Sequence, residues 1–170
     1  PTVLYAGRTG LGIQAALKTI ASAIQQVNAE LNLSIKFVLQ TAEIPDWAIT
    51  FSCVEHRSFV PYQELPKVFS AADLLILPYD FSPRATQYIK YSMPTKASEY
   101  MASGTPIVIF APQDTAVVRY AEAHGWAEVV TENQVEALSK TIKQLISSES
   151  AKKSLAQNAQ EVAVMRHDLK

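Results

Sequence analysis

The sequence predicts an α/β fold, a Rossmann-like parallel sheet of about six strands with helices on both faces. Short apolar runs alternate with amphipathic helical patterns along the whole 170-residue chain, which is typical of parallel strands connected by helices. The runs at 74–77 and 107–110 are apolar throughout, as expected for strands buried on both faces of a sheet. Ligands of such sheets bind beyond the carboxyl ends of the strands, so the loops that follow strands are where a site is expected.

The order of the predicted elements fits a single domain over residues 1–170. Strands are predicted at 3–6, 35–39, 54–60, 74–77, 107–110 and 127–130. Helices are predicted at 13–31, 64–72, 94–103 and 115–123, with two more closing the chain. Residues 43–52 have no clear pattern, and residues 78–93 are predicted to form a long irregular loop. A loop of that length in a compact domain is commonly functional.

The composition fits a folded domain without a strong overall charge. Hydrophobic residues make up 48% of the chain and charged residues 18%, which is typical of globular proteins. The formal net charge of −1 gives no overall field that would attract nucleic acid or an anionic membrane. The single cysteine, Cys53, cannot form an internal disulfide, which fits a reducing compartment. The chain starts at Pro1 with a strand-like segment, so we expect residues of a longer protein to precede it.

A glycine-rich loop follows the first predicted strand. Gly7, Gly10 and Gly12 lie within six positions and allow the backbone to turn sharply and approach a ligand closely. The N–H groups of such a loop, at the start of a helix, favour an anion, and Arg8 could add a bidentate contact to a phosphate. The order G-x-x-G-x-G differs from the dinucleotide fingerprint and from the Walker motif. From these residues alone, a phosphate site and a tight turn with a surface arginine both stay open.

A second loop leads into the helix that is predicted to begin at Pro94. Proline suits the first turn of a helix, where its missing N–H is not needed, and Ser92 and Met93 precede it. The free amides of Thr95 and Lys96 would then point out of the helix start. The loop is therefore a second candidate site for an anion.

Lys96 and Glu99 are three residues apart, so they share one face of this helix. The spacing would place a cation near a bound phosphate and a carboxylate one turn deeper, where it could accept two hydroxyl hydrogen bonds from a ribose. The alternative is a surface ion pair between the two side chains. On spacing alone the ion pair is the better interpretation.

This loop and its surroundings resemble the GT-B glycosyltransferases of the family-4, or group-1, type. Residues 94–108 match the family's pattern P-[ST]-K-x-x-E-Y-x-A-x-G-x-P-[IV]-[IV], which is a specific signal. Residues 58–66 resemble the family segment that contacts the base, residues 69–78 its ADV-x-x-x-P strand, and residues 5–8 the G-R opening of its C-terminal domain. The resemblance covers essentially the whole chain in the same order. It implies that the chain is the donor-binding half of a two-domain GT-B enzyme.

The resemblance also implies roles for individual residues. Arg8 and Lys96 would bind the donor diphosphate and stabilise the charge that develops on it as the leaving group. Glu99 would bind the ribose hydroxyls, backbone around Val60 would meet the base, and residues 79–93 would face the donor sugar. The expected donor-binding residues are Gly7, Gly10, Gly12, Val60, Tyr91, Ser92, Met93, Pro94, Thr95 and Glu99.

The implied activity is retaining, metal-independent transfer of a sugar from a nucleoside-diphosphate sugar to an acceptor. No cofactor or nucleic acid is expected, and no D-x-D carboxylate pair is present. His56 lies three residues after Cys53, but no second pair of ligands stands nearby, so no metal site is predicted. The acceptor-binding N-terminal domain is not in this chain, so the fragment alone is expected to be inactive. The family suggests a cytoplasmic role in polysaccharide biosynthesis, with peripheral membrane association through the other domain.

Two departures from the family pattern keep alternatives open. Tyr91 stands where the family often has a second glutamate, and Gly12-Ile13-Gln14 occupy the region where a lysine often follows the G-R arginine. A non-catalytic nucleotide-sugar-binding or interaction domain with a degenerate site is therefore one alternative. A GT-B sugar-nucleotide epimerase is another, although it would need a cluster of carboxylates and histidine beyond Glu99.

The predicted loop at 78–93 carries the remaining candidate groups. Arg84 and Lys90 outnumber Asp80 there, so the loop is expected to be locally cationic and suited to a diphosphate. Three tyrosines in this region could stack on a sugar or dock the absent domain: Tyr79, Tyr88 and Tyr91. Trp47 is expected to be a packing residue, with a place at the border of the base pocket as the alternative.

Overall fold

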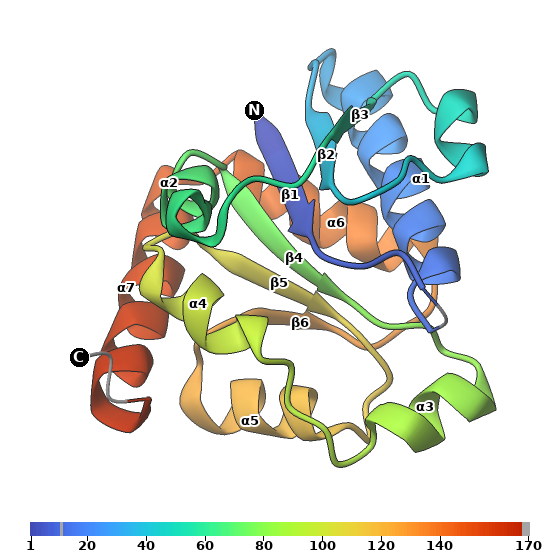
Figure 1. Cartoon of the computed structure of the whole chain (residues 1–170). Coiled ribbons are helices and arrows are strands. Elements are labelled where there is room, and N and C mark those ends of the chain that lie inside the picture. The colour runs from blue at the N-terminus through green and yellow to red at the C-terminus, as the bar shows by residue number, and fades with distance from the viewer. Residues whose placement is uncertain (11, 168–170) are drawn as a thin grey trace.

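A computed structural model describes residues 1–10 and 12–167 of the chain, and this part contains one sheet of six parallel strands (Figure 1). In sequence order the strands are β1 (Thr2–Ala6), β2 (Lys36–Gln40), β3 (Val54–Arg57), β4 (Leu74–Pro78), β5 (Ile107–Phe110) and β6 (Glu128–Val130). Their order across the sheet is β3-β2-β1-β4-β5-β6. The predicted Rossmann-like α/β fold is confirmed, since this is the strand order of doubly wound dinucleotide-binding sheets.

The described residues also form seven α-helices and two short 3₁₀ turns. The helices are α1 (Gln14–Leu31), α2 (Leu65–Ser70), α3 (Pro83–Ile89), α4 (Lys96–Ala102), α5 (Ala116–His124), α6 (Val135–Ile146) and α7 (Glu149–Arg166). The turns are η1 (Asp46–Thr50), within the segment that had no clear pattern, and η2 (Tyr62–Glu64). None of the described helices is long and apolar enough to cross a membrane.

Helices cover both faces of the sheet because successive strand residues point to opposite sides. In β1, Val3 and Tyr5 join the core under α1 and α6, whereas Leu4 and Ala6 join the core under α2, α4, α5 and α7. Figure 1 shows these two helical layers, with α1 and α6 on one side of the sheet and α4, α5 and α7 on the other. Each layer buries a continuous apolar cluster, which is the dominant favourable term in folding.

The predicted irregular loop at 78–93 is wrong in its centre, where α3 forms. Ser82 caps this helix by accepting a hydrogen bond from the amide of Ala85 at 3.2 Å, and Pro83 occupies the first turn. Only Ala85 and Ile89, four residues apart, are buried on its inner side. Two apolar positions are too few to make a helical period visible in the sequence.

The helix predicted to begin at Pro94 begins two residues later, at Lys96. The amide of Ala97 donates to the carbonyl of Pro94 at 3.0 Å, three residues back, so the chain enters α4 through a tighter turn. Thr95 is the N-cap residue, and its side chain makes no capping hydrogen bond. α4 has only seven residues, so aligned peptide dipoles contribute less to anion binding than a long helix would supply.

The topological switch point lies between β1 and β4. These neighbouring strands pair in parallel at Val3–Leu74 and Leu4–Leu75. The chain leaves β1 toward α1 on one face, and from β4 it proceeds through α3 to α4, which covers the other face. The loops therefore diverge at this point, and a crevice at the carboxyl edge is expected between them.

Candidate functional site

Helix α4 is joined to the end of β1 through the backbone of a single residue, Ala6. The Ala6 amide donates to the hydroxyl oxygen of Tyr100 at 3.0 Å. The Ala6 carbonyl accepts a hydrogen bond from the ammonium of Lys96. Tyr100 is fully buried, and its burial raises the pKa of the phenol, so it stays protonated. Both predicted loops therefore meet at one point at the carboxyl end of β1.

The Lys96 ammonium lies directly against the backbone of Gly7. A Cβ atom at Gly7, whose φ is +155°, would lie 2.0 Å from Lys96 Nζ and 2.9 Å from the hydroxyl of Tyr5. The same ammonium lies 4.7 Å from the centroid of the Tyr5 ring, a cation–π distance. The Tyr5 hydroxyl in turn donates to the Arg8 carbonyl at 2.6 Å. A side chain at Gly7 would therefore displace the Lys96 ammonium and crowd the Tyr5 hydroxyl, and the φ of +155° also favours glycine.

Lys96 is half-buried and makes no ion pair with any carboxylate in the described residues. Burial lowers its pKa to about 8, and the nearby charge of Glu99 opposes part of that shift. The surface ion pair between Lys96 and Glu99, which the spacing alone favoured, is therefore not what the structure contains. A partly desolvated cation without an anionic partner is suited to bind an anionic group.

Glu99 has a different partner, the phenol of Tyr62. The Tyr62 hydroxyl donates to Glu99 Oε1 at 2.9 Å, across 37 positions of sequence. This hydrogen bond raises the pKa of Tyr62. Sequence reasoning missed Tyr62 although it lies in the segment that resembles the base-contacting region, because no local spacing links it to Glu99.

The glycines of the first loop have unequal roles. Gly12 has a φ of +86°, which favours glycine, and its carbonyl accepts from the amide of Asp80 at 2.8 Å. A Cβ atom at Gly10 would meet nothing within 4 Å, so that position tolerates a side chain. Arg8 is exposed beside it. The loop therefore needs glycine at its two ends, next to α4 and next to α3.

Two polar side chains hold this loop against its neighbours. Asp80, which follows β4, accepts from the amide of Ala16 at 2.8 Å and so caps the first turn of α1. Gln14 donates to the Thr9 carbonyl and accepts from the indole of Trp47 at 2.8 Å. Trp47 is therefore tied to the glycine loop as well as packed against the core. Gln14, in the region where the family often has a lysine, supports the loop without adding charge.

A cavity of about 940 Å³ opens between the start of α1 and α3. Its lining is Gly12, Ile13, Tyr79, Asp80, Ser82, Arg84, Ala85, Gln87, Tyr88 and Ile89. Its volume and its mixture of apolar, aromatic and a few polar groups are typical of small-molecule sites. The cavity lining does not include Lys96 or Glu99. The carboxyl edge of the sheet therefore has two neighbouring regions, one around Lys96 and Glu99 and one at the cavity, and Gly12 lies at the border of the cavity.

The three tyrosines of segment 79–91 do not share one environment. Tyr79 is partly buried, and burial raises its pKa to about 12. Tyr88 is 86% exposed and lines the cavity with Tyr79. Tyr91 is 81% exposed and is not part of the cavity lining.

The remaining predicted site residues lie around the site without bonding to its centre. Val60 and Pro94 are half-buried, and Ser92, Met93 and Thr95 are exposed. None of the five makes a described hydrogen bond to Ala6 or to the Lys96 ammonium.

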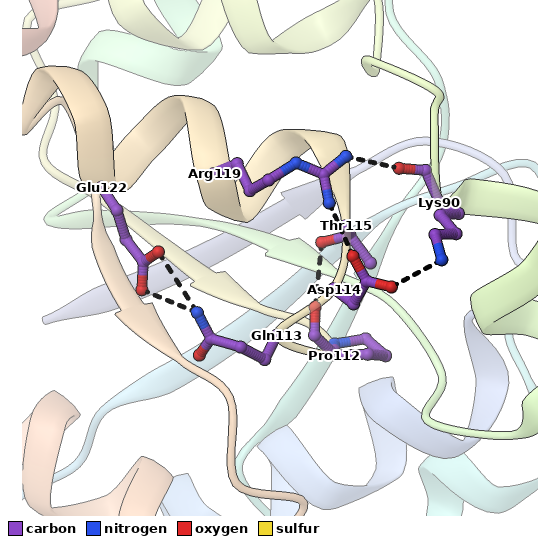
Figure 2. Close-up of polar contacts among 7 residues, drawn as sticks. All are labelled: Lys90, Pro112, Gln113, Asp114, Thr115, Arg119 and Glu122. Carbon is purple, nitrogen blue, oxygen red and sulfur yellow. Dashed lines mark hydrogen bonds and ion pairs between the residues drawn. The ribbon is translucent and has the colours of Figure 1, made fainter.

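The expectation of a locally cationic loop needs a correction at Lys90. Figure 2 shows that Asp114 lies between two cations, with Lys90 at 2.7 Å and Arg119 at 2.8 Å. This pairing raises the pKa of Lys90 and lowers that of Asp114. Arg119 also donates to the Lys90 carbonyl at 3.2 Å. The charge of Lys90 is thus used to tie the end of α3 to the start of α5.

Three cations near the site make no ion pair in the part of the chain that the structure describes. They are Arg8, Arg84 and Lys96. Over the same described residues, no group of three His, Cys, Asp or Glu side chains could hold a metal ion. The site's chemistry therefore consists of cations, backbone amides, phenols and two carboxylates, those of Glu99 and Asp80, a set suited to an anionic ligand with hydroxyl groups.

The sequence profile of the glycosyl transferases of group 1 matches residues 1–148 of this chain. The chain belongs to this family. No curated protein sequence matches it. Among solved structures it is similar to the C-terminal domain of LpcC, a glycosyl transferase group 1 family protein from Francisella tularensis, with a TM-score of 0.70 and 12% identity over 99% of this chain and 86% of that one. The group 1 domain therefore has the fold of the C-terminal half of a GT-B glycosyltransferase.

Two longer proteins have the same fold in part of their length. Sucrose-phosphate synthase from Thermosynechococcus elongatus matches with a TM-score of 0.75 and 18% identity over 97% of this chain and 41% of that one. HepE from Anabaena, in complex with UDP and glucose, matches with a TM-score of 0.67 and 17% identity over 97% of this chain and 44% of that one. The group 1 domain thus spans about two fifths of the length of these relatives.

Proposed function

We propose that this domain binds the nucleoside-diphosphate sugar from which a group 1 glycosyltransferase transfers a sugar. The observation that carries the proposal is the half-buried ammonium of Lys96. It lies against Gly7 at the end of β1 and has no anionic partner among the described residues. Glu99, on the next turn of the same helix, is the carboxylate that would bind ribose hydroxyls. The structure of HepE with UDP and glucose makes a uridine diphosphate sugar the first ligand to test.

The arrangement of groups along the carboxyl edge matches the order of groups in such a donor. Glu99 and Tyr62 lie at the η2 side, where the nucleoside would bind near Val60. Lys96 and the Gly7 end of the loop come next, where the diphosphate would bind together with exposed Arg8. Gly12 borders the cavity at α3, which is large enough for the sugar. The amides of Thr95 and Lys96 contribute less in this proposal than the Lys96 cation, because α4 is short.

The proposed chemistry is electrostatic stabilisation of the leaving group. Transfer breaks the bond between the anomeric carbon and a diphosphate oxygen, and negative charge develops on that diphosphate. Lys96 and Arg8 would stabilise this charge in a partly dehydrated crevice, where such interactions are stronger than in water. In this proposal the two cations take the place that a metal ion has in a metal-dependent transferase. Retention of the anomeric configuration follows from the family resemblance alone.

In this proposal the acceptor is held by a second domain that the present chain does not include. The chain alone would then bind the donor weakly and transfer nothing. A cytoplasmic role in polysaccharide biosynthesis, with peripheral membrane association through the other domain, completes the proposal at the level of the family. Exposed Tyr88 is available for stacking on the sugar, and exposed Tyr91 for contact with the other domain.

Calorimetric titration of the domain with UDP, GDP and ADP tests the proposal. We expect saturable binding of one nucleotide, and loss of that binding in the Lys96→Ala, Glu99→Ala double variant. Lys143→Ala is the matched control, because Lys143 pairs with Glu30 at 3.0 Å on the α1–α6 side of the sheet. Absence of binding to all three nucleotides at millimolar concentration would contradict the proposal and favour the degenerate interaction domain that Tyr91 suggests.

A further inference from the structure

The hydrogen bond between Tyr62 and Glu99 joins two sides of the proposed nucleoside region. Tyr62 is 68% exposed and lies in η2, immediately before α2. Its hydroxyl donates to Glu99 Oε1 at 2.9 Å. Without this hydrogen bond, the exposed side chain of Tyr62 would be free to point into solvent. A role for Tyr62 in ligand recognition rests on the proposed function, since Tyr62 can act only through the ligand that Glu99 binds.

The backbone turn that carries Tyr62 is held next to α4 by contacts other than this hydrogen bond. The amide of Glu64 donates to the carbonyl of Pro61 at 2.9 Å and closes the η2 turn. The turn leads directly into α2, whose Phe69 is buried and packs edge-on against Tyr100 with ring centroids 4.9 Å apart. Tyr100 is the residue after Glu99. The donor therefore lies in a turn that leads into α2, the acceptor lies in α4, and α2 packs against α4.

A carboxylate with one such partner is better prepared to bind a diol than a free one. Each carboxylate oxygen can accept two hydrogen bonds, so Tyr62 leaves Glu99 able to accept from two neighbouring hydroxyls. A glutamate side chain loses rotamer freedom when it binds a ligand, and a bond that already fixes its rotamer reduces that loss. Hydrogen bonds between a hydroxyl and a carboxylate are among the stronger ones, so this contact can hold the orientation.

We propose that Tyr62 is a positioning residue for ribose recognition, which orients Glu99 so that its carboxylate accepts the vicinal hydroxyls of the nucleoside. Tyr62 acts through Glu99 and has no part in the transfer itself. Because its pKa is raised by Glu99, the phenol remains a donor throughout the neutral range. The effect is specific to the hydroxyls: a nucleotide that lacks them gains nothing from the orientation of Glu99.

The test is a cycle of two proteins and two ligands, measured by calorimetry. The proteins are the unmodified domain and Tyr62→Phe, and the ligands are the nucleoside diphosphate that binds and its 2′,3′-dideoxy analogue. We expect Tyr62→Phe to weaken binding of the ribonucleotide by about 3- to 10-fold, which is part of the free energy of a hydrogen bond to a charged group. Binding of the dideoxy analogue should be unchanged. In a Glu99→Gln background the same substitution should have little effect on either ligand.

Tyr120→Phe is the matched control, because it also removes a tyrosine hydroxyl that hydrogen-bonds to a side chain, that of His167 at 3.0 Å. Near-ultraviolet circular dichroism confirms that each variant is folded. Equal weakening of both ligands by Tyr62→Phe would overturn the inference, since it would mean that Tyr62 contacts the base or phosphate directly. No weakening of either ligand would overturn it as well. Failure of the unmodified domain to bind any nucleotide would instead defeat the proposed function, and this inference with it.

Discussion

The two regions of the carboxyl edge, one around α4 and one around α3, differ in how far their polar groups are already engaged. Around α4, Lys96, Glu99 and Tyr100 each bond to another segment of the chain. Around α3, the cavity of about 940 Å³ is bordered by exposed Arg84 and Tyr88 and stays open. The α4 region is thus organised in advance, which reduces the entropy lost on binding.

The contrast suggests that the two regions bind different parts of the ligand. The common part of every donor, ribose and diphosphate, would bind to the prearranged α4 region, and the variable sugar would bind to the open α3 region. The ion pairs of Asp114 with Lys90 and Arg119 hold the end of α3 to the start of α5, at the connection that joins the two regions. Substitutions can test whether the regions act separately.

The largest effect is expected from Lys96→Ala. Loss of a charge-assisted hydrogen bond to the diphosphate should weaken nucleoside-diphosphate binding by about 10- to 100-fold. Lys90→Ala is the matched control, because that lysine already pairs with Asp114 at 2.7 Å, and it should change the dissociation constant less than about 3-fold. Isothermal titration of both variants measures the difference. Similar losses of affinity in the two variants would mean that Lys96 contributes no more to diphosphate binding than a lysine outside the α4 region.

Gly7→Ala should disturb the same cation without removing it. The added Cβ would lie 2.0 Å from Lys96 Nζ, so the ammonium must move from its seat. We expect nucleotide affinity to fall by about 10- to 30-fold, a loss of the order of one misplaced charged hydrogen bond. Gly10→Ala is its control, since a Cβ there meets nothing within 4 Å. Equal nucleotide affinity in both variants would show that the position of the Lys96 ammonium against Gly7 does not affect binding.

The pH dependence of binding should also identify Lys96. Its pKa is about 8 in the free domain, and a bound diphosphate favours the charged form, so affinity is highest where the lysine is already protonated. Between pH 7 and 9 the protonated fraction falls about tenfold, and the affinity should fall with it. In Lys96→Arg, whose guanidinium stays charged, the profile should be flat over this range. A falling profile in that variant would assign the titration to another group.

The division between the two regions also marks how far the sequence could predict the structure. The sheet and most helices were predictable because strand runs and helical periods are local patterns. Lys96 and Glu99 were found through a motif, but their partners were not: Lys96 bonds to Ala6 across 90 positions and Glu99 to Tyr62 across 37. Such pairs depend on how elements pack, and no spacing within a segment encodes them.

The α3 region was predicted less well, for a different reason. Its helix rests on two buried positions, Ala85 and Ile89, and the readable signal was the Ser82-Pro83 start, a capping residue followed by proline. The charge of the segment was misjudged because Lys90 finds Asp114, 24 positions later in the chain, on another loop. Charge counted along a sequence says little about charge left free after folding.

The smallest effect, and the sharpest test of separate roles, is expected from Arg84→Gln. Arg84 lines the cavity and makes no ion pair among the described residues, so it should contact only what enters the cavity. Binding of the bare nucleoside diphosphate should stay within about 2-fold, whereas the extra affinity that an attached sugar contributes should fall by about 2- to 5-fold, the value of one exposed polar contact. Paired titrations with the nucleotide and the nucleotide sugar separate the two contributions. If the bare nucleotide weakens as much as the nucleotide sugar, the diphosphate itself reaches α3, and the two regions form one site.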